Sequence, residues 1–214
     1  MCGRYSFTQP VEAVRQHFGF DNQPNLAPRS AFAPTMDVPV VRRRADGTRA
    51  LGNVRWGLVP SWAKDPKIGA KMFNARSESL AEKPSFRAAF GRRRCLILAD
   101  GFYEWQKLGP QEKQVWRIER PDNEAFAFAG LWERWQDTAG AKIDSCTIIT
   151  IAANALLSPI HDRMPVVIQE PDYGAWLDNT TPMPAVQGLV RQPAEDFFIT
   201  FKIGPDLDRT RRVA

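Results

Sequence analysis

The sequence is poor in the residues that build disulfide frameworks and metal sites. Its 214 residues include three cysteines and two histidines, and no CxxC pair occurs. A disulfide framework needs paired cysteines, and a structural zinc site needs about four Cys or His ligands at short spacings. We therefore expect no disulfide scaffold, no bound metal and no other cofactor.

Long apolar segments are also missing. No apolar run approaches the roughly 20 residues that span a bilayer, and the N-terminus lacks the basic and apolar stretches of a signal peptide. The hydrophobic content of 43% and charged content of 25% are typical of soluble globular proteins. We expect a cytoplasmic monomer, neither secreted nor bound to a membrane, whose residues 1–214 form one domain.

Positive charge is in excess but is not decisive. The net charge of +5 is compatible with a polyanionic partner without establishing one. Arginines cluster at residues 42–44, 92–94 and 211–212, and lysines lie along the segment 64–71. Each cluster taken alone is better explained as a solvated face.

Apolar alternation predicts a chain made mainly of strands. The predicted strands are residues 38–43, 50–60, 95–106, 114–120, 125–135, 146–154, 164–168 and 197–203. Short helices are predicted at 8–20, 77–91 and 171–179, a long loop at 20–36, and hairpin turns at 107–113 and 120–125. This pattern predicts a single β-rich α+β domain, with a curved antiparallel sheet or open β-barrel and peripheral short helices.

The three cysteines differ in their surroundings. Cys95 and Cys146 lie in apolar strand sequences, where a buried small side chain is expected. Cys2 stands in the polar, glycine-containing stretch "MCGRY". If Met1 is removed, Cys2 carries a free amine and a thiol on neighbouring carbons, a pair that no other residue type offers.

The stretch "WGLVPSWAKDPKIGAKMFNARSES" reads as an irregular basic loop with two tryptophans. Such a loop suits single-stranded nucleic acid, because its basic side chains can bind phosphates and its aromatic rings can stack on bases. Core positions for Trp56 and Trp62 are an equally good interpretation.

Two further polar residues stand out. Glu104 lies between Tyr103 and Trp105 after an apolar strand, so a raised pKa would allow it to act as an acid or base near neutral pH. An exposed strand glutamate is the alternative. His161 lies on a proline-flanked turn, where it can transfer protons or serve a structural role.

Four motifs, in their order and spacing, resemble the SRAP family of abasic-site processing proteins. They are "MCGRY", "WGLVPSW" running into "FNARSES", "CLILADGFYEW" and "IHDRMPVVI", and the resemblance covers roughly residues 1–170. It implies an α+β domain on a curved, barrel-like sheet, whose N-terminal cysteine crosslinks to abasic sites in single-stranded DNA during the DNA damage (SOS) response.

The resemblance also implies roles for individual residues. Cys2 is the nucleophile, Asn74 holds it and the sugar, Glu104 shuttles protons, and His161 assists opening of the sugar ring. The positions implied to lie near the DNA strand are Arg4, Pro34, Trp62, Arg76, Arg87 and Thr150.

The sequence departs from the family pattern at two places. Ala31 stands where the family usually has an asparagine ahead of an "AP" turn, and residues 197–214 match the usual closing motif poorly. No functional residue is assigned in that last segment.

The chemistry of a 1,2-aminothiol supports the same function without reference to the family. Its amine condenses with an aldehyde to an imine, and its thiol then closes a five-membered thiazolidine, which would shield the lesion. Two other functions remain open. One is an N-terminal nucleophile hydrolase, either a self-processing cysteine peptidase or an amidohydrolase, with a lyase-type activity also possible. The other is a non-covalent single-strand binding module.

Overall fold

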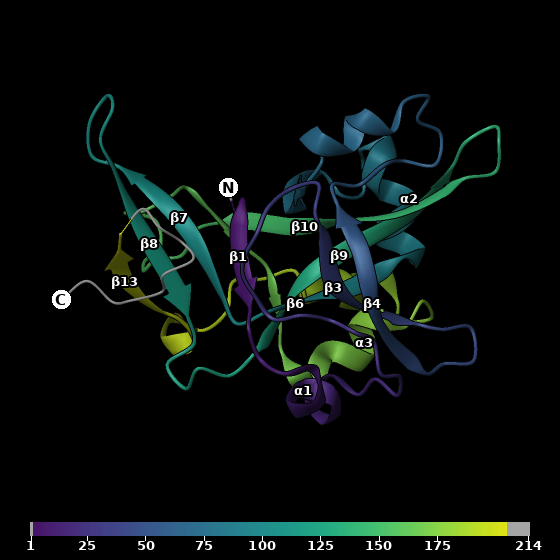
Figure 1. The fold of residues 1–214 in the computed structure, drawn as a ribbon, viewed down its shortest axis with the longest axis horizontal. Coiled ribbons are helices and arrows are strands. Elements are labelled where there is room, and N and C mark those ends of the chain that lie inside the picture. The colour runs from purple at the N-terminus through teal and green to yellow at the C-terminus, as the bar shows by residue number, and fades with distance from the viewer. Residues whose placement is uncertain (1, 205–214) are drawn as a thin grey trace.

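The computed structural model describes residues 2–204 and arranges them in two β-sheets that lie side by side (Figure 1). The smaller sheet has the strand order β13-β8-β7-β1-β2. Its strands are β1 (Arg4–Phe7), β2 (Arg29–Phe32), β7 (Gly101–Lys107), β8 (Lys113–Glu119) and β13 (Ile199–Ile203). All of its strand pairs are antiparallel.

The larger sheet closes on itself. Its order is β11-β10-β4-β3-β6-β9-β12, and β9 also pairs with β10, so that β10, β4, β3, β6 and β9 form a ring. Its strands are β3 (Asp37–Arg43), β4 (Arg49–Trp56), β5 (Asn74–Arg76), β6 (Arg94–Ala99), β9 (Phe126–Gln136), β10 (Lys142–Ala152), β11 (Arg163–Pro165) and β12 (Val167–Ile168). The prediction of a β-rich, barrel-like fold is confirmed, although β10 pairs with β4 and β5 in parallel.

Short helices lie around the sheets. The α-helices are α1 (Val11–Phe18), α2 (Pro84–Arg92), α3 (Tyr173–Leu177) and α4 (Met183–Gly188), and the 3-10 helices are η1 (Pro66–Lys71), η2 (Ser77–Ser79), η3 (Glu170–Asp172) and η4 (Glu195–Phe197). The predicted helix at 77–91 is in fact η2 and α2, because Pro84 takes the first position of a new helix.

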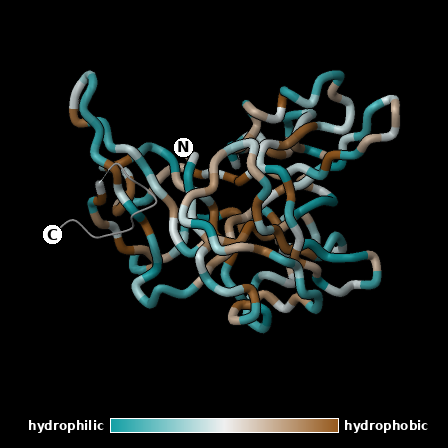
Figure 2. Tube along the Cα trace, in the orientation of Figure 1, coloured by the Kyte–Doolittle hydropathy of each residue, from teal (hydrophilic) through white to brown (hydrophobic). Residues whose placement is uncertain are grey.

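Apolar side chains from both sheets share one large core. Every residue of β6 is buried, which explains why its sequence after Arg94 reads as an uninterrupted apolar run rather than an alternation. Figure 2 shows the hydrophobic stretches of the trace gathered in the interior and hydrophilic ones on the projecting loops. No helix within residues 2–204 is long and apolar enough to cross a membrane.

The structure corrects two predicted strand connections. The single strand predicted at 95–106 is divided at Asp100, so that β6 belongs to the larger sheet and β7 to the smaller one. The hairpin predicted at 120–125 is wrong, because β8 and β9 also belong to different sheets. The hairpin at 107–113 is confirmed by the pairing of β7 with β8.

Some elements were not predicted from the sequence. β2 occupies part of the predicted loop at 20–36, β5 lies at the end of the tryptophan-containing loop, and α4 follows α3. β2 and β5 have four and three residues, too short to display a periodicity of their own. The Arg211–Arg212 cluster and the last part of the segment 197–214 lie outside the described residues.

Candidate active site

Cys2 lies just before strand β1, which pairs with β7 and β2 in the smaller sheet. β1 pairs with β7 in the register Arg4 to Tyr103, so the residues just before Arg4 run alongside Glu104. The Cys2 side chain is completely buried, which the polar flanks of the sequence did not predict. Burial raises the pKa of the Cys2 thiol, and the nearby Glu104 charge raises it further. The thiolate is therefore disfavoured at neutral pH.

A buried polar network holds β1 in place. Arg117 donates from Nη1 to Ser6 Oγ at 2.9 Å and to the Tyr103 hydroxyl at 2.8 Å. Asp100 accepts from Ser6 Oγ at 2.5 Å and from Thr8 Oγ1 at 2.6 Å. Because buried polar groups need partners, these bonds favour one register of β1 and so one position for Cys2.

Asn74 reaches Cys2 from the larger sheet. It begins β5, which pairs in parallel with β10 opposite Ile148. Its Nδ2 donates to the backbone oxygen of Cys2 at 2.9 Å. Its Oδ1 is buried and has no hydrogen-bond partner within residues 2–204, which leaves an acceptor to meet a ligand hydroxyl.

The loop before Asn74 is fastened by close backbone contacts. Gly57 adopts a φ of 133°, and a Cβ there would lie 2.5 Å from the Gly69 carbonyl oxygen. Trp56 is fully buried and donates from Nε1 to Phe73 O at 2.7 Å. The core interpretation is therefore correct for Trp56, whereas Trp62 on the same loop is 58% exposed.

Glu104 is buried rather than exposed, so the alternative of a solvated strand glutamate is wrong. The residue has an exposed fraction of 4%. Burial raises the pKa of Glu104 to about 7, and the charge of Asp162 adds to this shift. Glu104 is thus poised to gain or lose a proton near neutral pH.

His161 lies in the turn that also carries Asp162. Its backbone N–H donates to Leu157 O at 2.9 Å, and burial lowers the pKa of the imidazole. Nδ1 lies 3.0 Å from the backbone N of Arg163 and 2.8 Å from Asp162 Oδ1. Nδ1 without a proton accepts from the Arg163 N–H, whereas Nδ1 with a proton donates to Asp162, so only one of these two bonds can form at a time. Because the lowered pKa favours the neutral ring and Asp162 is largely exposed, we assign Nδ1 as the acceptor and place the proton on Nε2.

The residues predicted to lie near DNA fall into three groups by their burial. Trp62, Arg76 and Arg87 are exposed, Arg4 and Pro34 are half-buried, and Thr150 is fully buried. Thr150 pairs with Arg76 between β10 and β5, and its Oγ1 has no hydrogen-bond partner in the described part of the chain. These DNA contacts stay predictions.

The structure adds site neighbours that the sequence did not single out. Trp116 is paired with Glu104 across the β7–β8 hairpin, a position that the hairpin spacing alone would have given. Arg163 binds the Glu78 carboxylate through Nη1 at 2.6 Å and Nη2 at 2.9 Å, and this pair lowers the pKa of Glu78 to about 2. It ties η2 to β11 beside the site.

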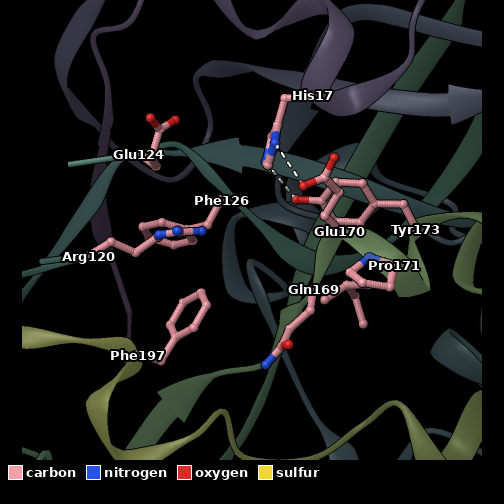
Figure 3. A pocket seen from close by; sticks show the side chains of 10 residues that line it. His17, Arg120, Glu124, Phe126, Gln169, Glu170, Pro171, Tyr173 and Phe197 are labelled. Carbon is pink, nitrogen blue, oxygen red and sulfur yellow. Dashed lines mark hydrogen bonds and ion pairs between the residues drawn. The ribbon is translucent and has the colours of Figure 1, made fainter. Parts of the chain in front are cut away.

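A separate cavity lies elsewhere on the molecule. It has a volume of about 410 Å³, and its lining residues differ from every residue predicted for the site. Figure 3 shows His17 in this cavity, pointing toward Glu170 and Tyr173. His17 Nδ1 lies 3.4 Å from Glu170, and Nε2 lies 3.4 Å from the Tyr173 hydroxyl. His17 is therefore half-buried and has two polar neighbours in this cavity.

All three cysteines are free and buried, as predicted for Cys95 and Cys146. Among residues 2–204, no group of three or more His, Cys, Asp or Glu side chains is arranged to hold a metal ion.

Known proteins share this sequence and fold. A family model described as SOS response associated peptidase (SRAP) matches residues 1–209, which extends well beyond residue 170. The abasic site processing protein YoqW of Bacillus subtilis (strain 168) is 42% identical over 187 residues, covering 85% of this chain and 83% of YoqW. The abasic site processing protein HMCES of Rattus norvegicus is 32% identical over 227 residues, covering 83% of this chain and 64% of HMCES. A crystal structure of a Bacteroides thetaiotaomicron protein has a TM-score of 0.86 over 96% of this chain and 93% of that chain, at 23% identity, which shows a common fold.

Proposed function

The chain belongs to the SOS response associated peptidase (SRAP) family, and from this premise we propose that it processes abasic sites in single-stranded DNA by crosslinking Cys2 to the opened sugar. The observation that supports the proposal most directly is the position of Cys2. Its backbone oxygen lies 2.9 Å from Asn74 Nδ2, and its thiol lies within the electrostatic influence of a buried glutamate. Relatives that carry the name abasic site processing protein indicate the substrate.

The proposed reaction begins with removal of Met1, which frees the Cys2 amine. The amine attacks the aldehyde carbon of the opened sugar to give a carbinolamine, which loses water to form an imine. The thiol then adds to the imine carbon, its proton passes to the nitrogen, and a five-membered thiazolidine closes. No electrons are exchanged with another reagent, and water is the only leaving group.

The surroundings of Cys2 favour this order of steps. A thiol with a raised pKa is a poor first nucleophile, whereas an α-amino group ordinarily titrates near 8 and is partly neutral at physiological pH. Closure of the ring is intramolecular, so the thiol needs less activation in the second step. We assign the amine as the first nucleophile and the thiol as the second.

The neighbouring residues supply proton transfer and orientation. Glu104, with a pKa of about 7, takes a proton from the amine and returns it as water leaves the carbinolamine. His161, as a neutral imidazole, donates a hydrogen bond from its Nε2–H to the ring oxygen as the sugar opens. The unpartnered Oδ1 of Asn74 accepts a hydrogen bond from a sugar hydroxyl.

A crosslinking assay tests the proposal. Protein shown by mass spectrometry to lack Met1 is mixed with a single-stranded oligonucleotide that contains one abasic site, then denatured and separated by electrophoresis. We expect a shifted band that a tetrahydrofuran analogue, which lacks the aldehyde, does not give. No adduct from protein with a free Cys2 amine would overturn the proposal.

Trp62 provides a separate prediction about DNA binding. We expect Trp62→Ala to weaken non-covalent binding of single-stranded DNA about 10-fold, because one base stack contributes roughly 1–3 kcal/mol. Fluorescence anisotropy at several salt concentrations measures the affinity, which should also fall as salt rises. Leu108→Ala is the matched control, since Leu108 is 54% exposed on the β7–β8 hairpin. Equal affinities for the two variants would remove Trp62 from the DNA interface.

Amide cleavage is a second candidate function, because the description of the family names a peptidase. In that reaction the Cys2 amine serves as the base for its own thiol, and a peptide carbonyl replaces the aldehyde. The raised pKa of the thiol opposes this reaction. Competition between a peptide amide and abasic DNA for Cys2 distinguishes the two functions.

A further inference from the structure

Gln106 lies on β7 two residues after Glu104, so both side chains project from the same face of the strand. The Gln106 amide makes two hydrogen bonds of ordinary length. Its Oε1 accepts from Trp116 Nε1 at 2.9 Å, and its Nε2 donates to Pro159 O at 2.9 Å.

The chemistry of the two partners fixes the orientation of this amide. An indole N–H only donates and a carbonyl oxygen only accepts. Reversing the amide would therefore set donor against donor at Trp116 and acceptor against acceptor at Pro159. Gln106 has a single orientation in which both bonds form.

The two partners belong to different segments near the candidate site. Trp116 is the cross-strand partner of Glu104. Pro159 lies in the turn that ends in His161, and this turn buries Leu157 and Ile160 in the core. The hydrogen bond from Gln106 Nε2 to Pro159 O joins β7 to this turn.

We propose that Gln106 is a positioning residue that holds the turn carrying His161 at a fixed place relative to Glu104. The inference rests on the proposed function, because it concerns the geometry of the same site. Gln106 itself does not touch the reacting atoms. It acts through Pro159 and Trp116.

The first test compares crosslinking rates of three variants. Gln106→Met has a similar size and loses both bonds, whereas Gln106→Lys restores a donor to Pro159 O. Gln114→Met is the matched control, since Gln114 is paired with Gln106 and donates instead to Val115 O and Ile203 O. We expect Gln106→Met to crosslink about 10-fold more slowly at unchanged DNA affinity, because small misplacements of reacting groups are costly. Gln106→Lys should recover most of the rate, and Gln114→Met should match the unsubstituted protein.

The second test does not depend on crosslinking. The chain has two histidines, so an NMR titration of the imidazole C–H signals reports His161 with His17 as an internal reference. Loss of the Pro159 bond should admit water around His161 and move its lowered pKa up toward the ordinary value near 6.5. Gln106→Met leaves the neighbouring charges of Glu104, Lys107 and Asp162 in place.

The outcomes separate the two proposals. An unchanged His161 titration and rate in Gln106→Met would overturn the positioning role, as would a Gln106→Lys protein as slow as Gln106→Met. If the unsubstituted protein forms no adduct while the His161 titration shifts in Gln106→Met, the proposed function fails and the positioning role stands.

Discussion

The Cys2→Ala protein is expected to form no adduct that survives denaturation, while borohydride should still trap it on abasic DNA. Alanine at position 2 keeps the α-amine after Met1 is removed, so the imine forms. It lacks the thiol that closes the thiazolidine, and an imine alone hydrolyses readily. Electrophoresis with and without borohydride measures both products, and the durable adduct should fall at least 100-fold, as expected for loss of the group that completes covalent capture.

An N-terminal extension that cannot be removed provides the complementary variant. It keeps the Cys2 thiol but ties the amine into a peptide bond, so we expect neither a durable nor a borohydride-trapped product. Cys146→Ala is the control, because Cys146 is also a buried thiol but lies in β10. A durable adduct from Cys2→Ala, or from the extended protein, would contradict the amine-first reaction.

The fold was largely predictable wherever local sequence determines the element. The apolar runs around Cys95 and Cys146 specify buried strands, and both thiols are in the core. The break at Asp100 was not predictable, because apolar residues continue on both sides of it. Its cause is tertiary: Asp100 binds Ser6 and Thr8, which are more than 90 positions away in the chain.

The sequence indicated which residue types form the candidate site, but it did not indicate which of their side chains are buried. Trp56 and Trp62 share one loop and one composition, yet one is fully buried and the other is 58% exposed. Cys2 has polar neighbours in the sequence and a completely buried side chain, because β7 and β5 approach it from different sheets. Local patterns carry no information about such approaches, which is also why Gln106 was not identified.

Glu104→Gln should make the protein more stable and its chemistry slower. Burial raises the pKa of Glu104 from 4.5 to about 7, so between these pH values the folded state holds a proton that the unfolded state has released. The contribution of Glu104 to the free energy of unfolding therefore falls as pH rises from about 4.5 to about 7, by about 3 kcal/mol in total. Glutamine has no such titration. We expect Glu104→Gln to exceed the unsubstituted protein in stability above pH 7 and to match it most closely near pH 4.

The crosslinking rate should move in the opposite direction. Glutamine fills the same space but cannot take or return a proton, so we expect the rate at pH 7 to fall about 100-fold or more. Urea unfolding at pH 4.5 and pH 8 measures the stability, and single-turnover crosslinking measures the rate. Glu112→Gln, on the exposed end of the β7–β8 hairpin, is the control and should change neither. A variant that is stabilised above pH 7 yet crosslinks at the unsubstituted rate would leave Glu104 buried but without a role in proton transfer. If Glu104→Gln gains stability and loses crosslinking rate, the buried carboxyl group of Glu104 destabilises the fold and is needed for the reaction. Such a combination is typical of a functional residue.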